Sequence, residues 1–182
     1  MTGPTVLTII RMVLSVLFMV FALTPDVVPR TIALVIFIVA SITDNIDGRW
    51  ARKKKIVTDL GAFLDPLADK MLVNLAFLVL VYLYVIPVWV FAIILVRDFA
   101  IDGMRMMAAK DGITISASFF GKLKTTVQMI ALIILLLTLI VDVEAFRILG
   151  NIALYLALFL TVFSGLDYLV KGWRQMLRKS KK

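Results

Sequence analysis

Apolar residues gather in six long runs that are separated by short polar segments. The runs cover residues 5–23, 31–43 with a polar continuation to 52, 59–85, 88–96, 125–141 and 148–166. About 20 residues of helix span a bilayer core, and no run alternates like a barrel strand, so each run predicts one transmembrane helix. Pro25, Asp26 and Pro29 predict the first turn. We therefore expect an all-α polytopic membrane protein with six transmembrane helices in one domain, residues 1–182.

Composition supports this prediction and excludes several kinds of chemistry. The chain is 62% hydrophobic with a mean hydropathy of +1.04, whereas a soluble domain averages about half apolar residues. There is no cysteine and no histidine, which excludes disulfides, thiolate chemistry and an imidazole base. Residues 1–4 lack the basic cluster and cleavage site of a signal peptide, so we expect the first run to be retained.

Lysine and arginine are distributed unevenly between the two ends of the predicted helices. With six helices, 17 of the 20 fall on the side that holds both termini and the second and fourth loops. Arg30 and Arg147 fall on the other side, and Lys70 lies within a helix. Positive residues favour the cytoplasmic side, so we expect both termini in the cytoplasm and the chain in the cell membrane. The net charge of +8 is then mainly a topology signal, and we expect no nucleic-acid partner.

Four aspartates lie where the second run ends and the third begins. These acids and the small residues between them repeat at helical spacing, at Asp44, Asp47, Gly48 and Ala51 and again at Gly61, Asp65 and Asp69. Each set therefore shares one helix face. At 1.5 Å per residue, Asp44 lies about 20 Å from the start of its run and Asp69 about 24 Å from the end of its own. Both sets are therefore expected at one depth, toward the cytoplasmic side.

Four carboxylates at one depth of a membrane repel one another unless cations offset their charge. Because the sequence has neither histidine nor cysteine, we expect Mg²⁺ or Mn²⁺ rather than zinc. Two ions about 4 Å apart suit in-line displacement at phosphorus. The alternatives are aspartates that cap helices or face solvent, and a pathway for cations or protons. Neither alternative explains the small residues at matching positions.

The pattern D-x-x-D-G-x-x-A-R-x(8)-G-x-x-x-D-x-x-x-D is met at every fixed position, with eight residues between Arg52 and Gly61. This segment resembles the signature of the CDP-alcohol phosphatidyltransferases. The resemblance implies transfer of the phosphatidyl group of CDP-diacylglycerol to a small alcohol, with CMP leaving. It also implies six transmembrane helices, a homodimer and an active site that faces the cytoplasm.

The resemblance further implies a role for each signature residue. The expected metal ligands are Asp44, Asp47, Asp65 and Asp69. Asp69 is also the expected catalytic base for the acceptor hydroxyl. The expected contacts of the CDP-lipid are Gly48, Ala51 and Gly61 at the nucleotide, Arg52 at the pyrophosphate, and Thr8.

Three further segments resemble the bacterial branch of the family that uses glycerol 3-phosphate as acceptor. They are residues 4–11, Arg97–Asp98 with Arg105, and residues 121–129. Thr5 and Asp98 replace the Asn and Glu common in that branch, so we expect the contacts of Asp98 to be rearranged. The expected ligands of the acceptor phosphate are Arg97, Arg105, Lys122 and Lys124. Two alternatives stay open: cations that flank spans or bind lipid head groups, and another acceptor, such as inositol phosphate, serine or a lipid.

Overall fold

The computed structural model describes residues 3–54, 59–110 and 119–180, with side chains at 8–43, 68, 70–108 and 119–170. These residues form six helices and no strand, which confirms the all-α prediction. The helices are α1 (Gly3–Leu23), α2 (Val27–Lys54), α3 (Asp59–Tyr82), α4 (Val88–Lys110), α5 (Phe119–Leu137) and α6 (Glu144–Ser180). Contacts divide the chain into a first unit, Met1–Val85 with Leu135–Val143, and a second unit, Ile86–Ile134 with Glu144–Lys182. A single domain over residues 1–182 stays a prediction.

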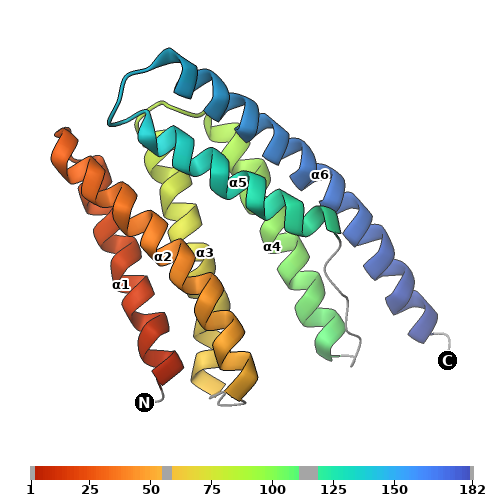
Figure 1. The fold of residues 1–182 in the computed structure, drawn as a ribbon. Coiled ribbons are helices and arrows are strands. Elements are labelled where there is room, and N and C mark those ends of the chain that lie inside the picture. The colour runs from red at the N-terminus through yellow and green to blue at the C-terminus, as the bar shows by residue number, and fades with distance from the viewer. Residues whose placement is uncertain (1–2, 55–58, 111–118, 181–182) are drawn as a thin grey trace. The chain divides into compact units, whose positions relative to one another are not determined.

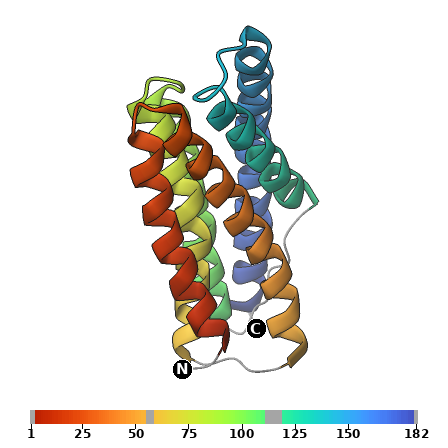
Figure 2. The same ribbon diagram turned by 60° about the vertical axis from the view of Figure 1, so that its left-hand side comes forward.

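In the first unit, α1 packs against both α2 and α3. Figures 1 and 2 show the three helices side by side, with α2 running opposite to the other two. The buried residues of α1 recur every three or four positions, at Thr8, Arg11, Ser15, Phe18 and Ala22. This period places them on one helix face. The rings of Phe18 and Phe37 lie 5.6 Å apart, between α1 and α2.

In the second unit, α4 packs against α6. The buried face of α4 includes Val90, Ile94 and Ile101, and the buried face of α6 includes Leu154, Ala157, Thr161, Ser164 and Tyr168. Helix α5 contacts α6 through Phe120 and Phe163, whose ring centroids are 5.1 Å apart. All three helices of this unit therefore contribute to one packed body.

Several helix ends differ from those expected from the apolar runs. Helix α2 begins at Val27, so the assignment of Pro29 to the turn was wrong. Proline is tolerated in a first turn because its missing N–H would have no partner there. Helices α4 and α6 continue beyond their apolar runs, to Lys110 and Ser180. Arginine, lysine and methionine, which have good helix propensity, recur in both extensions after the hydrophobic pattern ends.

Helix α3 ends in a Schellman motif whose left-handed residue is a tyrosine. The N–H of Val85 donates to the carbonyl of Leu80 at 2.9 Å, and that of Tyr84 to the carbonyl of Val81 at 3.1 Å. Tyr84 has a φ of 56°, where glycine is the usual residue. Its side chain is 95% exposed, so few contacts offset the backbone strain.

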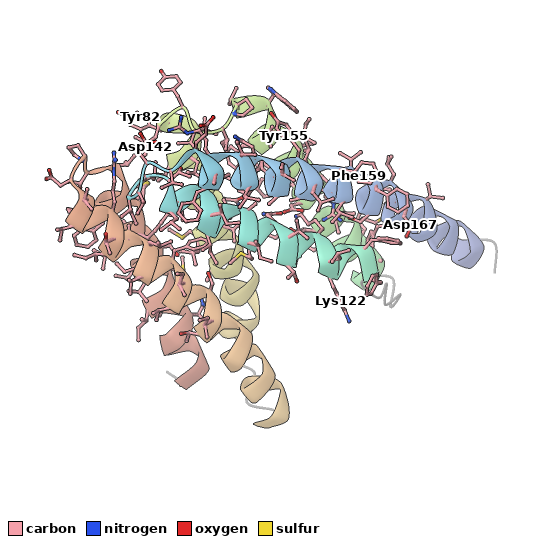
Figure 3. All side chains as sticks on the ribbon, turned by 45° about the horizontal axis from the view of Figure 1, so that its top comes forward. Tyr82, Lys122, Asp142, Tyr155, Phe159 and Asp167 are labelled. Atoms are coloured by element: carbon pink, nitrogen blue, oxygen red, sulfur yellow. The ribbon has the colours of Figure 1, made fainter. Side chains whose placement is uncertain are left out.

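The outer faces of both units carry large apolar side chains, including Val13, Val20, Val96, Phe99, Phe159 and Leu166. Figure 3 shows Phe159 standing out from α6. Within the described residues, Phe119–Leu137 and Glu144–Val170 are long and apolar enough to cross a membrane. Shorter apolar stretches cover Thr8–Leu23, Val27–Thr43 and Lys70–Tyr82. Six spans and the side of the termini stay predictions.

Candidate active site

The backbone of both signature segments is helical, as their spacing predicts. Asp44 and Asp47 fall in the C-terminal half of α2, and Asp65 and Asp69 in the N-terminal half of α3. Because α2 runs opposite to α3, these halves lie at the same end of the first unit (Figure 2). The side chains of the whole signature lie outside those described: Asp44, Asp47, Gly48, Ala51, Arg52, Gly61, Asp65 and Asp69. Their roles stay predictions.

The N-terminal half of α1 lies at this same end and buries polar side chains. Thr8 is 2% exposed, Arg11 7% and Ser15 0%, and the Ser15 hydroxyl donates to the Arg11 carbonyl at 2.8 Å. Thr8 was expected to contact the CDP-lipid. Arg11 was expected on the cytoplasmic side, at the end of the segment 4–11 that resembles the family, and the structure buries its side chain. The sequence held one signal for this position. Arg11 lies about one helical turn after Thr8, so the two residues share a helix face.

The donor set of the signature suits a hard divalent cation, because it consists of four carboxylates on two neighbouring helices. Members of the family generally depend on divalent metal. Among the side chains that the structure describes, no three acidic residues lie close enough to hold a metal. The four signature aspartates stay the predicted ligands of such an ion.

A partly buried ionic cluster lies in the second unit, where Asp98 pairs with two cations. Lys124 Nζ is 2.9 Å from both carboxylate oxygens of Asp98, and Arg97 Nη1 is 2.9 Å from Oδ1. The Lys124 side chain is 5% exposed, that of Arg97 18% and that of Asp98 25%. Asp98 thus joins α4 to α5, and the cluster holds two positive charges against one negative charge.

Helix α6 supplies the other partners of Arg97. Arg97 Nε donates to the Thr161 carbonyl at 3.2 Å, and Nη2 donates to the Ser164 hydroxyl at 2.8 Å. Two turns along α4, Arg105 Nε donates to the Tyr168 hydroxyl at 3.0 Å. The guanidinium carbon of Arg105 also lies 5.2 Å from the centre of that ring. Arg97 and Arg105 therefore both face α6.

The two predicted lysines of α5 have different surroundings. Lys124 is buried against Asp98, whereas Lys122 is exposed. Figure 3 shows the Lys122 side chain extending away from α5. One turn after Lys124, Gln128 is 4% exposed, and its buried Oε1 has no hydrogen-bond partner in the described part of the chain. The structure thus groups Arg97, Lys124 and Asp98, and leaves Lys122 outside this group.

The α6 residues that contact these arginines were not among the predicted site residues. Thr161 and Ser164 lie inside the apolar run 148–166, and Tyr168 lies just beyond it. None of the three is charged, and Thr161 contacts Arg97 through its backbone. Only their spacing at three and four residues marks them as sharing a helix face.

Comparisons with known proteins agree with the signature. A family model described as CDP-alcohol phosphatidyltransferase matches residues 1–163. A Bacillus subtilis (strain 168) protein named CDP-diacylglycerol–glycerol-3-phosphate 3-phosphatidyltransferase is 38% identical, with 95% of this chain and 96% of the relative covered. A protein of the same name from Pectobacterium atrosepticum is 39% identical, over 91% and 92% of the two chains. A probable phosphatidylglycerophosphate synthase of Mycobacterium tuberculosis is 34% identical, over 94% and 81%. The chain therefore belongs to the CDP-alcohol phosphatidyltransferase family.

Proposed function

We propose that this phosphatidyltransferase moves the phosphatidyl group of CDP-diacylglycerol to glycerol 3-phosphate, giving phosphatidylglycerophosphate and CMP. The names of the relatives, which match nearly the whole chain, support this acceptor. The observation that carries the proposal is the cluster of Arg97, Asp98 and Lys124. Its excess positive charge is held in fixed positions, which suits a phosphate dianion that leaves water on binding.

The two units are proposed to serve different substrates. Thr8, Gly48, Ala51, Arg52 and Gly61 of the first unit would bind the CDP-lipid. Arg97, Arg105 and Lys124 of the second unit would bind the phosphate of the acceptor, and the exposed Lys122 would add attraction at longer range. In this assignment, the phosphate binds the N–H groups of Arg97 that the contacts with Asp98, Thr161 and Ser164 do not use.

In the proposed reaction, the carboxylate of Asp69 accepts the proton of the acceptor hydroxyl. The hydroxyl oxygen forms a bond to the phosphorus that carries diacylglycerol. The bond from this phosphorus to the oxygen of CMP breaks, and CMP leaves with the electron pair. Mg²⁺ or Mn²⁺, as two ions held by Asp44, Asp47, Asp65 and Asp69, would neutralise charge on the pyrophosphate and on the departing CMP.

The chain is proposed to be a multi-pass protein of the cell membrane, with six spans and its active site toward the cytoplasm. The bias of Lys and Arg and the apolar outer faces support this arrangement. The resemblance to the family supports a homodimer. A reporter fused after Lys182 should read cytoplasmic and one placed within residues 25–29 external. The reverse pattern would contradict the topology.

The test of the function is CMP release by the purified protein from CDP-diacylglycerol with a panel of acceptors. We expect release with glycerol 3-phosphate, and little with inositol phosphate, serine or a lipid alcohol. Release with one of the others alone would keep the enzyme class and overturn the acceptor. No release with any acceptor, together with cation flux in vesicles, would favour the alternative of a transporter with an acidic site.

A further inference from the structure

Three groups of the protein itself contact the guanidinium of Arg97. Asp98 accepts from Nη1, the Thr161 carbonyl from Nε and the Ser164 hydroxyl from Nη2. These contacts leave one N–H on each terminal nitrogen for another partner. Two of the three contacts come from α6, so this helix fixes the direction in which the remaining N–H groups point.

Gly165, the next residue of α6, lies against the side chain of Arg97. A Cβ placed on Gly165 would lie 2.9 Å from Arg97 Cγ and 3.1 Å from Arg97 Nε. Cγ belongs to the stem of the arginine, so an added Cβ would force the stem to shift, and the guanidinium that makes the three contacts would shift with it. Gly103 of α4 offers a contrast, because its added Cβ would meet nothing within 4 Å.

Ser164 is fully buried, with 0% exposure. Its hydroxyl accepts from Arg97 and donates to the Thr161 carbonyl at 3.4 Å. A buried hydroxyl that both donates and accepts a hydrogen bond cannot rotate freely, so its oxygen accepts from a fixed position. Ser164 therefore specifies one position of Nη2, while Gly165 provides the space for the stem.

We propose that Ser164 and Gly165 of α6 are positioning residues that set the acceptor affinity of the enzyme through Arg97. The proposal rests on the function proposed above, in which Arg97 binds the phosphate of glycerol 3-phosphate. Neither residue contacts the acceptor. Together they orient the two remaining N–H groups of Arg97 so that a phosphate meets both at once.

The test is steady-state kinetics of Ser164→Ala and Gly165→Ala, with both substrates varied. Each substitution should raise the KM for glycerol 3-phosphate about tenfold, as expected when one charge-assisted contact is misplaced. The KM for CDP-diacylglycerol should stay unchanged. Gly103→Ala is the matched control and should change neither KM. Alanine favours helix more than glycine does, so a loss in Gly165→Ala would not reflect weaker helix propensity.

A double-mutant cycle separates positioning from a general packing effect. If Gly165 acts through Arg97, adding Gly165→Ala to Arg97→Ala should change the acceptor KM by less than about twofold. Additive losses, or equal effects of Gly165→Ala and Gly103→Ala, would overturn the inference. If the wild-type enzyme does not use glycerol 3-phosphate, the result contradicts the proposed function itself. Normal acceptor use with an unchanged KM in both α6 variants overturns the positioning role alone.

Discussion

The α1–α3 unit draws its candidate chemistry from one continuous stretch, residues 44–69 on α2 and α3. The α4–α6 unit assembles its own from three helices, with Arg97 and Asp98 on α4, Lys124 on α5 and Ser164 on α6. The first site is rich in carboxylates and is predicted to bind cations, whereas the second holds excess positive charge and suits an anion. This difference agrees with the proposal that one unit binds the metal and the nucleotide and the other binds the acceptor phosphate.

The largest expected effect tests the acidic site. Asp69→Asn removes the proposed base while keeping the side-chain volume, so kcat should fall by about 10²- to 10⁴-fold. The control is Asp26→Asn, since Asp26 is exposed and lies outside all helices. Initial rates of CMP release measure both variants. An Asp69→Asn enzyme within tenfold of the wild type would remove this residue from the role of base.

The next effect tests the basic site. Arg97→Ala should lower kcat/KM for glycerol 3-phosphate by about 10- to 100-fold, which corresponds to about 1.5–3 kcal/mol for a contact to a charged group. The KM for CDP-diacylglycerol should stay the same, because the nucleotide is assigned to the other unit. A change in the CDP-lipid KM alone would break the proposed division between the two units.

A smaller effect compares two lysines of one helix. Lys124→Met removes a buried cation beside Asp98 and should lower kcat/KM for the acceptor about tenfold. Lys122→Met removes an exposed charge and should change it by less than about threefold, because solvent screens such charges. Equal losses in the two variants would mean that burial does not distinguish their roles. Both effects are measured in the same acceptor titration.

The smallest effect lies away from both sites. Tyr84→Gly should raise the free energy of unfolding by about 1 kcal/mol, because glycine adopts the left-handed conformation without strain. Thermal unfolding in detergent measures this change, and both KM values should stay unchanged. A lower stability would mean that the tyrosine ring contributes more than its 95% exposure indicates.

The acidic signature and the helical class were predictable because each depends on local spacing. Six apolar runs indicate six helices, and acids at three- and four-residue intervals share a face wherever the chain is helical. The ends of α4 and α6 were not predictable from apolar runs, since charged residues also sustain helix. Pro29 was misassigned because a first turn and a loop both accept proline.

The surroundings of the cations depend on packing between distant helices, which no local pattern contains. Lys122 and Lys124 are two residues apart, yet one is exposed and the other pairs with Asp98. The contacts of Arg97 on α6 involve a backbone carbonyl, a hydroxyl and the space above a glycine. Groups of this kind are common in apolar helices, so their role emerges only when α4 and α6 are placed together.

Identification of both products from CDP-diacylglycerol and glycerol 3-phosphate tests the central claim most directly. The donor has two phosphorus atoms, and the products report which one the acceptor attacks. Attack at the lipid-bearing phosphorus, as proposed, gives CMP and phosphatidylglycerophosphate in equal amounts by mass spectrometry. Attack by the same hydroxyl at the nucleotide phosphorus would give a phosphodiester of CMP with glycerol 3-phosphate, together with phosphatidate, and attack by water would give CMP and phosphatidate. Either of these product pairs would contradict the proposed transfer.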